Sequence, residues 1–101
     1  MIKIEEVQAG SGPVAQAGNT VELNYRGSFP GGKEFDKGKF SFRIGSGQVI
    51  QGFDLGVTGM QAGGKRKITV PPEMGYGARG AGSAIPPNAT LVFELEVLKI
   101  S

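Results

Sequence analysis

Few side chains in this sequence could act as a nucleophile, a base or a metal ligand. The chain of 101 residues has no cysteine and no histidine, which excludes disulfides, thiol nucleophiles, zinc sites of the usual ligand type and triads that need an imidazole. Asp36 and Asp54 could form a hydrolytic carboxylate pair, but Asp54 lies between Phe53 and Leu55 in a predicted helix and is expected on its exposed face. We therefore expect an activity without reactive side chains, cofactor or metal.

Three other motifs indicate no chemistry of their own. The glycines of residues 75–82 lack the Gly-Lys-Ser/Thr ending of a P-loop and the context of a dinucleotide site. Asn88-Ala89-Thr90 matches a glycosylation sequon, but no secretory signal supports its use. The net charge is only +2, so lysine clusters such as residues 65–67 are interpreted as solvated faces. We expect no nucleic-acid partner, no membrane partner and a cytoplasmic location.

Aromatic residues are the feature that remains. Most could fill the core of a small β-rich domain. Phe35-Asp36 and Tyr76, however, lie in glycine-rich stretches that we interpret as loops, outside any regular apolar pattern. Aromatic side chains in loops beside a core favour a lined pocket over a filled interior. The eight aromatic residues are Tyr25, Phe29, Phe35, Phe40, Phe42, Phe53, Tyr76 and Phe93.

Strands with a period of two must position these side chains. Apolar and polar residues alternate over residues 20–26, 40–44, 65–70 and 93–97. Such alternation is typical of an antiparallel sheet that is covered on one face only.

The best candidate to cover that sheet is a helix over residues 49–61. Ile50, Phe53, Val57 and Met60 recur there at the spacing of one helical stripe. Three glycines within it each weaken a helix by about 1 kcal/mol relative to alanine, so the helix must be held by close packing on the sheet. We therefore predict one α+β domain over residues 1–101, a twisted antiparallel β-sheet wrapped around one short α-helix.

The order of motifs then resembles that of a known family along nearly the whole chain. The matching segments are YRG at 25–27, GKEFD at 32–36, FRIG at 42–45, VIQGF at 49–53, YG at 76–77 and IPPNATLVF at 85–93. The sequence is similar to the FK506-binding protein (FKBP) type of peptidyl-prolyl cis-trans isomerase. The resemblance implies the same fold as the one predicted above, with a pocket between helix and sheet.

The resemblance also implies roles for ten residues. It predicts that the Ile50 N–H and the Tyr76 hydroxyl donate hydrogen bonds to carbonyls of a substrate or ligand. The implied walls are Tyr25, Phe40 and Phe93, the side Val49 and Ile50, the floor Phe53, and the mouth Phe35, Asp36, Tyr76 and Ile85.

Three departures from the family pattern stand out. Phe53 replaces the usual tryptophan of the floor, which predicts a roomier pocket. Residues 36–40 form a shorter segment than usual, without its bulge or its arginine, which Lys37 or Lys39 could replace only in part. The glycine loop carries Ala81 and Ala84 where larger residues are frequent, so ligand contacts there are expected to be weaker.

The function implied is a peptidyl-prolyl isomerase (rotamase) that assists protein folding. Its expected partners are proline-containing peptides, unfolded or partly folded proteins, and macrolide inhibitors such as FK506 and rapamycin, and it is expected to be a monomer. Residues 75–84 would form a flap at the pocket mouth, and residues 86–87, both proline, would fix its return to the sheet. One alternative is an FKBP-fold module that binds proline-containing partners or acts as a chaperone with little isomerase activity. A purely structural β-domain is another, but it leaves the loop aromatics unexplained.

Overall fold

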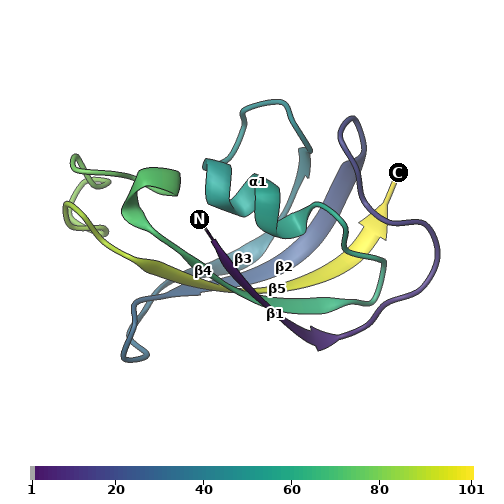
Figure 1. Cartoon of the computed structure of the whole chain (residues 1–101), viewed down its shortest axis with the longest axis horizontal. Coiled ribbons are helices and arrows are strands. Elements are labelled where there is room, and N and C mark those ends of the chain that lie inside the picture. Colours follow the sequence, from purple (N-terminus) through teal and green to yellow (C-terminus); the bar gives the residue numbers. More distant parts are fainter. Residues whose placement is uncertain (1) are drawn as a thin grey trace.

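Five strands form one antiparallel sheet, and a short helix lies across one face of it in a computed structural model that describes residues 2–101 (Figure 1). This arrangement confirms the predicted α+β fold. The strands are β1 (Lys3–Gln8), β2 (Thr20–Ser28), β3 (Glu34–Arg43), β4 (Lys65–Val70) and β5 (Leu91–Ile100), the helix is α1 (Gln51–Val57), and a single 3₁₀ turn, η1, covers Pro72–Met74. No helix among the described residues is long and apolar enough to cross a membrane.

The strand order is β1-β4-β5-β2-β3, which leaves β1 and β3 at the two edges. Two expectations about the strands need correction. The sequence pattern did not predict β1, whose residues are all exposed and so lack the buried alternation of the other strands. Strand β3 begins at Glu34 rather than at residue 40, so Phe35 and Asp36 lie in a strand and not in a loop.

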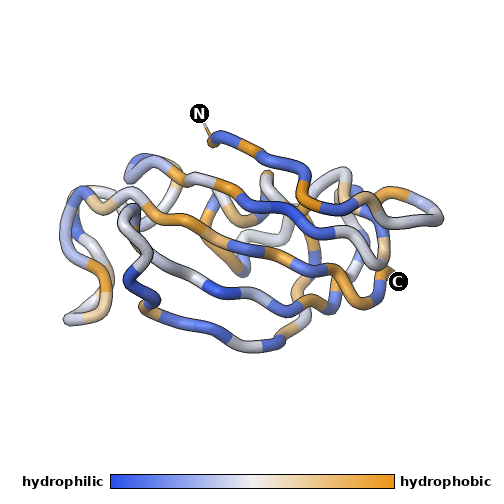
Figure 2. The backbone as a smooth tube through the Cα atoms, turned by 90° about the horizontal axis from the view of Figure 1, so that it is seen from below, coloured by the Kyte–Doolittle hydropathy of each residue, from blue (hydrophilic) through white to orange (hydrophobic). Residues whose placement is uncertain are grey.

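Alternation of side chains separates a buried face from a charged one. Figure 2 views the sheet from the side opposite the helix and shows hydrophilic and hydrophobic residues alternating along the strands. The buried positions on the helix side include Val21, Leu23, Ile68, Val70, Leu91, Phe93, Leu95 and Val97. The predicted one-sided sheet is therefore confirmed.

Helix α1 is shorter than the predicted stretch of residues 49–61, and two of its glycines lie directly against β4. A Cβ atom added to Gly52 would overlap the methyl groups of Val70, and one added to Gly56 would lie 2.5 Å from Cδ1 of Ile68. The glycines thus weaken the helix locally but let its backbone approach the sheet more closely than any other residue allows. This close approach holds a helix that would not form by itself.

Arg66 binds carbonyl groups at the C-terminal end of α1. The sequence interpretation of residues 65–67 as a solvated face is therefore wrong for Arg66. Its Nη1 atom donates hydrogen bonds to the carbonyl oxygens of Gly56 (3.0 Å) and Thr58 (2.8 Å), and its Nε donates to Glu6 (2.8 Å). The side chain is only 13% exposed. One cation therefore satisfies carbonyl groups at the helix C-terminus, where positive charge is favourable, and joins them to β1.

The contact between Gly52 and Val70 predicts that replacement of Gly52 by alanine lowers the free energy of unfolding, although helix propensity alone would raise it. Gly52→Ala gains about 1 kcal/mol of helix propensity but must push α1 away from a β-branched side chain, so we expect a net loss of about 2 kcal/mol. For a domain of this size the melting temperature should fall by about 10 °C. Gln51→Ala, an exposed neighbour in the same helix, should change stability by less than about 0.5 kcal/mol. Equal melting temperatures for the two variants would contradict the packing argument.

Candidate functional site

A cavity of about 200 Å³ lies between α1 and the helix-facing side of the sheet. Nine of the ten predicted site residues line it, and they come from β2, β3, β5, α1 and the loops before α1 and after η1. These nine are Tyr25, Phe35, Asp36, Phe40, Val49, Ile50, Phe53, Tyr76 and Phe93. The structure therefore brings together, in one place, residues that are far apart in the sequence.

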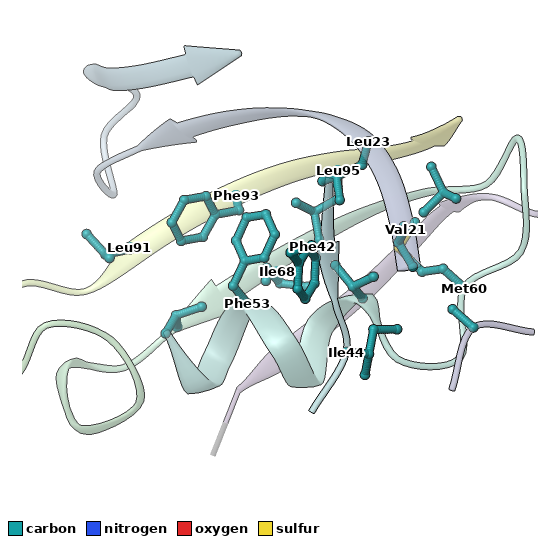
Figure 3. Close-up of a cluster of buried hydrophobic side chains, with 14 of the residues drawn as sticks. Val21, Leu23, Phe42, Ile44, Phe53, Met60, Ile68, Leu91, Phe93 and Leu95 are labelled. Atoms are coloured by element: carbon teal, nitrogen blue, oxygen red, sulfur yellow. The ribbon is translucent and has the colours of Figure 1, made fainter. Parts of the chain in front are cut away.

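Phe53 stands at the centre of the aromatic lining. It projects from α1 toward the sheet, close to Phe93 and Phe42 (Figure 3), with ring centroids 5.2 Å and 5.7 Å from theirs. The rings of Tyr25 and Phe40 lie 6.2 Å and 5.5 Å away. Phe53 is only 4% exposed, so these mostly edge-on contacts fix its ring.

A β-bulge places two consecutive residues of β3 at the cavity. Gly27 pairs with Asp36 and Ser28 pairs with Glu34, so Phe35 is the extra residue. Because a bulge interrupts the alternation of side chains, Phe35 and Asp36 both line the cavity. From Asp36 to Arg43 the register with β2 is unbroken, so residues 36–40 contain no β-bulge.

Gly27, which sequence reasoning did not single out, leaves the space for this arrangement. A Cβ atom at Gly27 would lie 2.6 Å from Cζ of Phe35 and 3.0 Å from Cε1 of Phe93. The two phenyl rings, 5.8 Å apart, therefore meet over a residue without a side chain. A glycine inside an otherwise regular strand is the signal that could have identified it.

Among residues 2–101, one hydrogen bond between two side chains lies inside the site, and it joins Tyr25 and Asp36. The Tyr25 hydroxyl donates a 2.7 Å hydrogen bond to Asp36, and the Lys37 backbone N–H donates to the same carboxylate at 2.9 Å. Burial, together with the hydrogen bond to the Asp36 carboxylate and its negative charge, raises the pKa of Tyr25 to about 12. Among residues 2–101 neither Lys37 nor Lys39 forms an ion pair with Asp36, so the missing arginine is not replaced.

Two hydrogen-bond donors of the cavity have no acceptor within the described chain. Ile50 is the N-cap residue of α1, and its carbonyl accepts from the N–H groups of Phe53 and Asp54 while its own N–H has no partner. The Tyr76 hydroxyl also makes no hydrogen bond to residues 2–101, and its side chain is 40% exposed. Both residues line the cavity.

Ile85, predicted at the mouth, does not line the cavity. It is 4% exposed and belongs to the hydrophobic core. Its backbone exchanges two hydrogen bonds with Ala81, of 2.9 Å and 3.1 Å, which closes the glycine loop on itself. Ile85 therefore anchors the loop that carries Tyr76.

The paired-carboxylate hypothesis has no geometric support. Asp54 is half-buried rather than exposed. Both of its carboxylate oxygens accept from the Gly45 N–H, at 3.1 Å and 3.2 Å. A larger depression of about 350 Å³ lies on the outer face of the sheet, but its lining consists mainly of charged and polar side chains, such as Lys65, Lys67 and Glu96. The cavity beside α1 is thus the candidate site.

Comparison with protein families matches residues 12–98 to the FKBP-type peptidyl-prolyl cis-trans isomerase family. An FK506-binding protein of Neisseria meningitidis is 49% identical over 102 residues, covering 96% of this chain and 94% of the relative. The peptidyl-prolyl cis-trans isomerase FKBP15-3 of Arabidopsis thaliana is also 49% identical, covering 96% of this chain and 72% of the relative.

Solved structures agree with these relatives. The crystal structure of FkpA from Escherichia coli matches with a TM-score of 0.89 and 39% identity, over 99% of this chain and 48% of that one. A peptidyl-prolyl cis-trans isomerase from Pseudomonas syringae matches with a TM-score of 0.89 and 38% identity, over 99% of this chain and 75% of that one.

The environment of Tyr25 predicts its titration. The chain has two tyrosines, so in a Tyr76→Phe variant the absorbance of tyrosinate reports Tyr25 alone. Its midpoint should stay well above the usual value of about 10, because the variant removes only the smallest cause of the raised pKa, the charge of Tyr76. Asp36→Asn in that background should lower the midpoint because it removes the negative charge. Because the folded pKa lies above the unfolded value of about 10, Tyr25 stabilises the fold below pH 10, and this contribution is lost as the pH rises toward 12. A midpoint near 10 in a chain that is still folded by circular dichroism would contradict the hydrogen bond.

Proposed function

Since the chain belongs to the FKBP-type peptidyl-prolyl cis-trans isomerases and is an enzyme of this kind, we propose that it catalyses rotation about X–Pro bonds in the cavity between α1 and the sheet. The observation that carries this proposal is the composition of the lining. Six of its nine residues are aromatic, two are aliphatic, and Asp36, the one carboxylate, already accepts a hydrogen bond from Tyr25.

The reaction needs no group that transfers protons or forms bonds. Rotation about a peptide bond has a barrier of about 18–20 kcal/mol because twisting breaks the amide resonance. X–Pro bonds populate both isomers and interchange over about ten to one hundred seconds without a catalyst. The absence of histidine and cysteine is therefore no obstacle to catalysis.

The aromatic lining supplies a reason for the acceleration. A planar amide is more charge-separated than a twisted one, so an apolar surrounding raises the energy of the ground state more than that of the transition state. Acceleration by four decades needs only about 5.5 kcal/mol of this difference. The prolyl ring would lie over Phe53, between Tyr25, Phe40 and Phe93.

The unpartnered donors supply orientation. In this proposal the Ile50 N–H donates to a substrate carbonyl on one side of the rotating bond, and the Tyr76 hydroxyl donates to another carbonyl. Such bonds hold one part of the peptide while the other turns. Asp36, with its hydrogen bond from Tyr25, fixes the tyrosine ring as a wall rather than acting as a base.

Substrate binding should be weak. Burial of about 100 Å² of prolyl ring at about 25 cal/mol/Å² contributes only about 2.5 kcal/mol, less than the roughly 4 kcal/mol of millimolar affinity. The loop of residues 75–84 adds contacts from Tyr76, and its glycines let it adapt to different sequences around the proline. Varied proline-containing peptides and partly folded chains would therefore serve as substrates, which supports a role in protein folding.

The names of the relatives support a further ligand class. Proteins 49% and 50% identical to this chain are named as FK506-binding, so we propose that FK506 and rapamycin-type macrolides occupy the same cavity. Residues 1–101 would act as one monomeric, cytoplasmic domain. The single domain, the monomeric state and the cytoplasmic location are proposed from the sequence alone.

The central experiment is catalysed cis-to-trans isomerisation of a short peptide with a hydrophobic residue before proline, with and without FK506. We expect an acceleration that the drug abolishes. Drug binding without acceleration would favour the binding-module alternative. Acceleration that is indifferent to the drug would place the reaction outside this cavity.

Removal of the Tyr76 hydroxyl should reduce kcat/KM without abolishing catalysis. Tyr76→Phe should lower kcat/KM by about threefold to tenfold, since an exposed neutral hydrogen bond contributes about 0.5–1.5 kcal/mol. The melting temperature should stay within about 2 °C because the hydroxyl has no partner in residues 2–101. An unchanged kcat/KM would exclude Tyr76 from substrate binding.

A further inference from the structure

The segment that carries the Ile50 N–H is irregular. Residues 44–50 connect the end of β3 to the start of α1 and belong to no helix or strand (Figure 1). Gly45 and Gly47 have φ angles of 83° and 79°, a region that glycine enters without steric cost. The N–H groups of residues 47–50 donate to no backbone carbonyl among residues 2–101. Other contacts must therefore fix the direction of the Ile50 N–H.

Asp54 joins the two ends of this segment. Its carboxylate accepts from the Gly45 N–H with both oxygens, at 3.1 Å and 3.2 Å, and its own backbone N–H donates to the Ile50 carbonyl at 3.1 Å. In the described part of the chain, no other side chain of α1 forms a hydrogen bond with residues 44–50. Hydrogen bonds to a charged acceptor are roughly twice as strong as neutral ones. One residue of the helix thus holds the segment at its start and at its end.

These hydrogen bonds have no role in the reaction or the helix cap described so far. Asp54 does not line the cavity, and no side chain caps the N-terminus of α1. A half-buried carboxylate loses part of its hydration and needs hydrogen bonds in return. The carboxylate of Asp54 obtains them from the loop that precedes the helix and not from the helix itself.

The contact bears on catalysis through the direction of one donor. The Ile50 carbonyl is held by the N–H groups of Phe53 and Asp54, both at 3.1 Å. The Ile50 N–H belongs to the preceding peptide plane, whose orientation follows the path of the loop. A hydrogen bond weakens steeply when its angle at the hydrogen falls below about 120°. A small turn of this plane would therefore remove the orientation that the donor gives to a substrate.

We propose that Asp54 is a positioning residue of the isomerase, because its carboxylate holds residues 45–50 so that the Ile50 N–H can donate to a substrate carbonyl. This inference rests on the isomerase site proposed above and adds to it a residue outside the cavity. Asp54 acts through Ile50 and does not touch the substrate. The position requires a hydrogen-bond acceptor rather than a negative charge.

Three variants separate the hydrogen bond from charge and from stability. Asp54→Ala removes both the acceptor and the charge. Asp54→Asn removes the charge but keeps a carbonyl oxygen as acceptor. Gln61→Ala is the matched control, because Gln61 is also half-buried and its side chain donates to the Gly12 carbonyl between two segments that do not line the cavity.

The first measurement is catalysed cis-to-trans isomerisation of a peptide with a hydrophobic residue before proline, well below the lowest melting temperature of the four proteins. We expect Asp54→Ala to lower kcat/KM by about threefold to tenfold, the range for loss of one neutral hydrogen bond to the substrate. Asp54→Asn should recover the value of the unaltered protein to within about twofold. Gln61→Ala should leave kcat/KM unchanged.

The Ile50 amide proton gives a second readout, which general destabilisation would not move. On addition of the same peptide at matched occupancy, its NMR signal should shift downfield in the unaltered protein and in Asp54→Asn, because a hydrogen bond forms. The shift should be smaller in Asp54→Ala. The amide signal of Phe93, which reports occupation of the cavity, should respond equally in all three proteins.

Every other outcome overturns the inference. An unchanged kcat/KM in Asp54→Ala, with the unaltered protein active, would remove Asp54 from catalysis and leave the isomerase function intact. An equal loss in Asp54→Asn would assign the effect to charge, and an equal loss in Gln61→Ala would assign it to stability. A loss of rate with a normal Ile50 shift would mean that Asp54 acts through another group. No acceleration by the unaltered protein would overturn the proposed isomerase function itself, and the inference with it.

Discussion

The distance between α1 and β4 is the constraint on which the rest of the structure depends. Gly52 and Gly56 let the helix backbone touch the side chains of Val70 and Ile68, and this depth places the Phe53 ring among the aromatic residues of the sheet (Figure 3). A helix with ordinary side chains at both positions would stand farther from the sheet and leave Phe53 without its neighbours. The glycines that make the helix weak are therefore the ones that make the cavity possible.

The chemistry of the site follows from fixed shape and not from ionisation. Its carboxylate is held by the Tyr25 hydroxyl, whose pKa is raised to about 12, and there is no histidine in the chain. Such a site presents the same aromatic surface over a wide range of pH. Rotation about an amide bond needs this kind of surface, because the barrier is electronic and the transition state is less polar than the planar amide.

Sequence patterns predicted the elements whose burial follows a simple period, and failed where tertiary contacts decide. The strands over Thr20–Ser28 and Leu91–Ile100 were found because their apolar residues alternate. β1 was missed because all its residues are exposed. The start of β3 was missed because its first half has glycine and lysine where a buried strand would have apolar residues. The burial of Ile85 and the contacts of Arg66 with the end of α1 were not foreseen, because loop closure and helix capping depend on tertiary contacts that no local pattern records.

The strand order has a consequence for how the chain folds as it is synthesised. β5 lies between β4 and β2, and Ile100 pairs with Val21 (Figure 1). The strand at the middle of the sheet is thus the last of the five to be made, and β2 has no inner neighbour until it arrives. Folds with such distant pairings form slowly, and unpaired strands are exposed to aggregation in the meantime. We therefore expect this protein to need protection by other folding factors while its own chain is still incomplete on the ribosome.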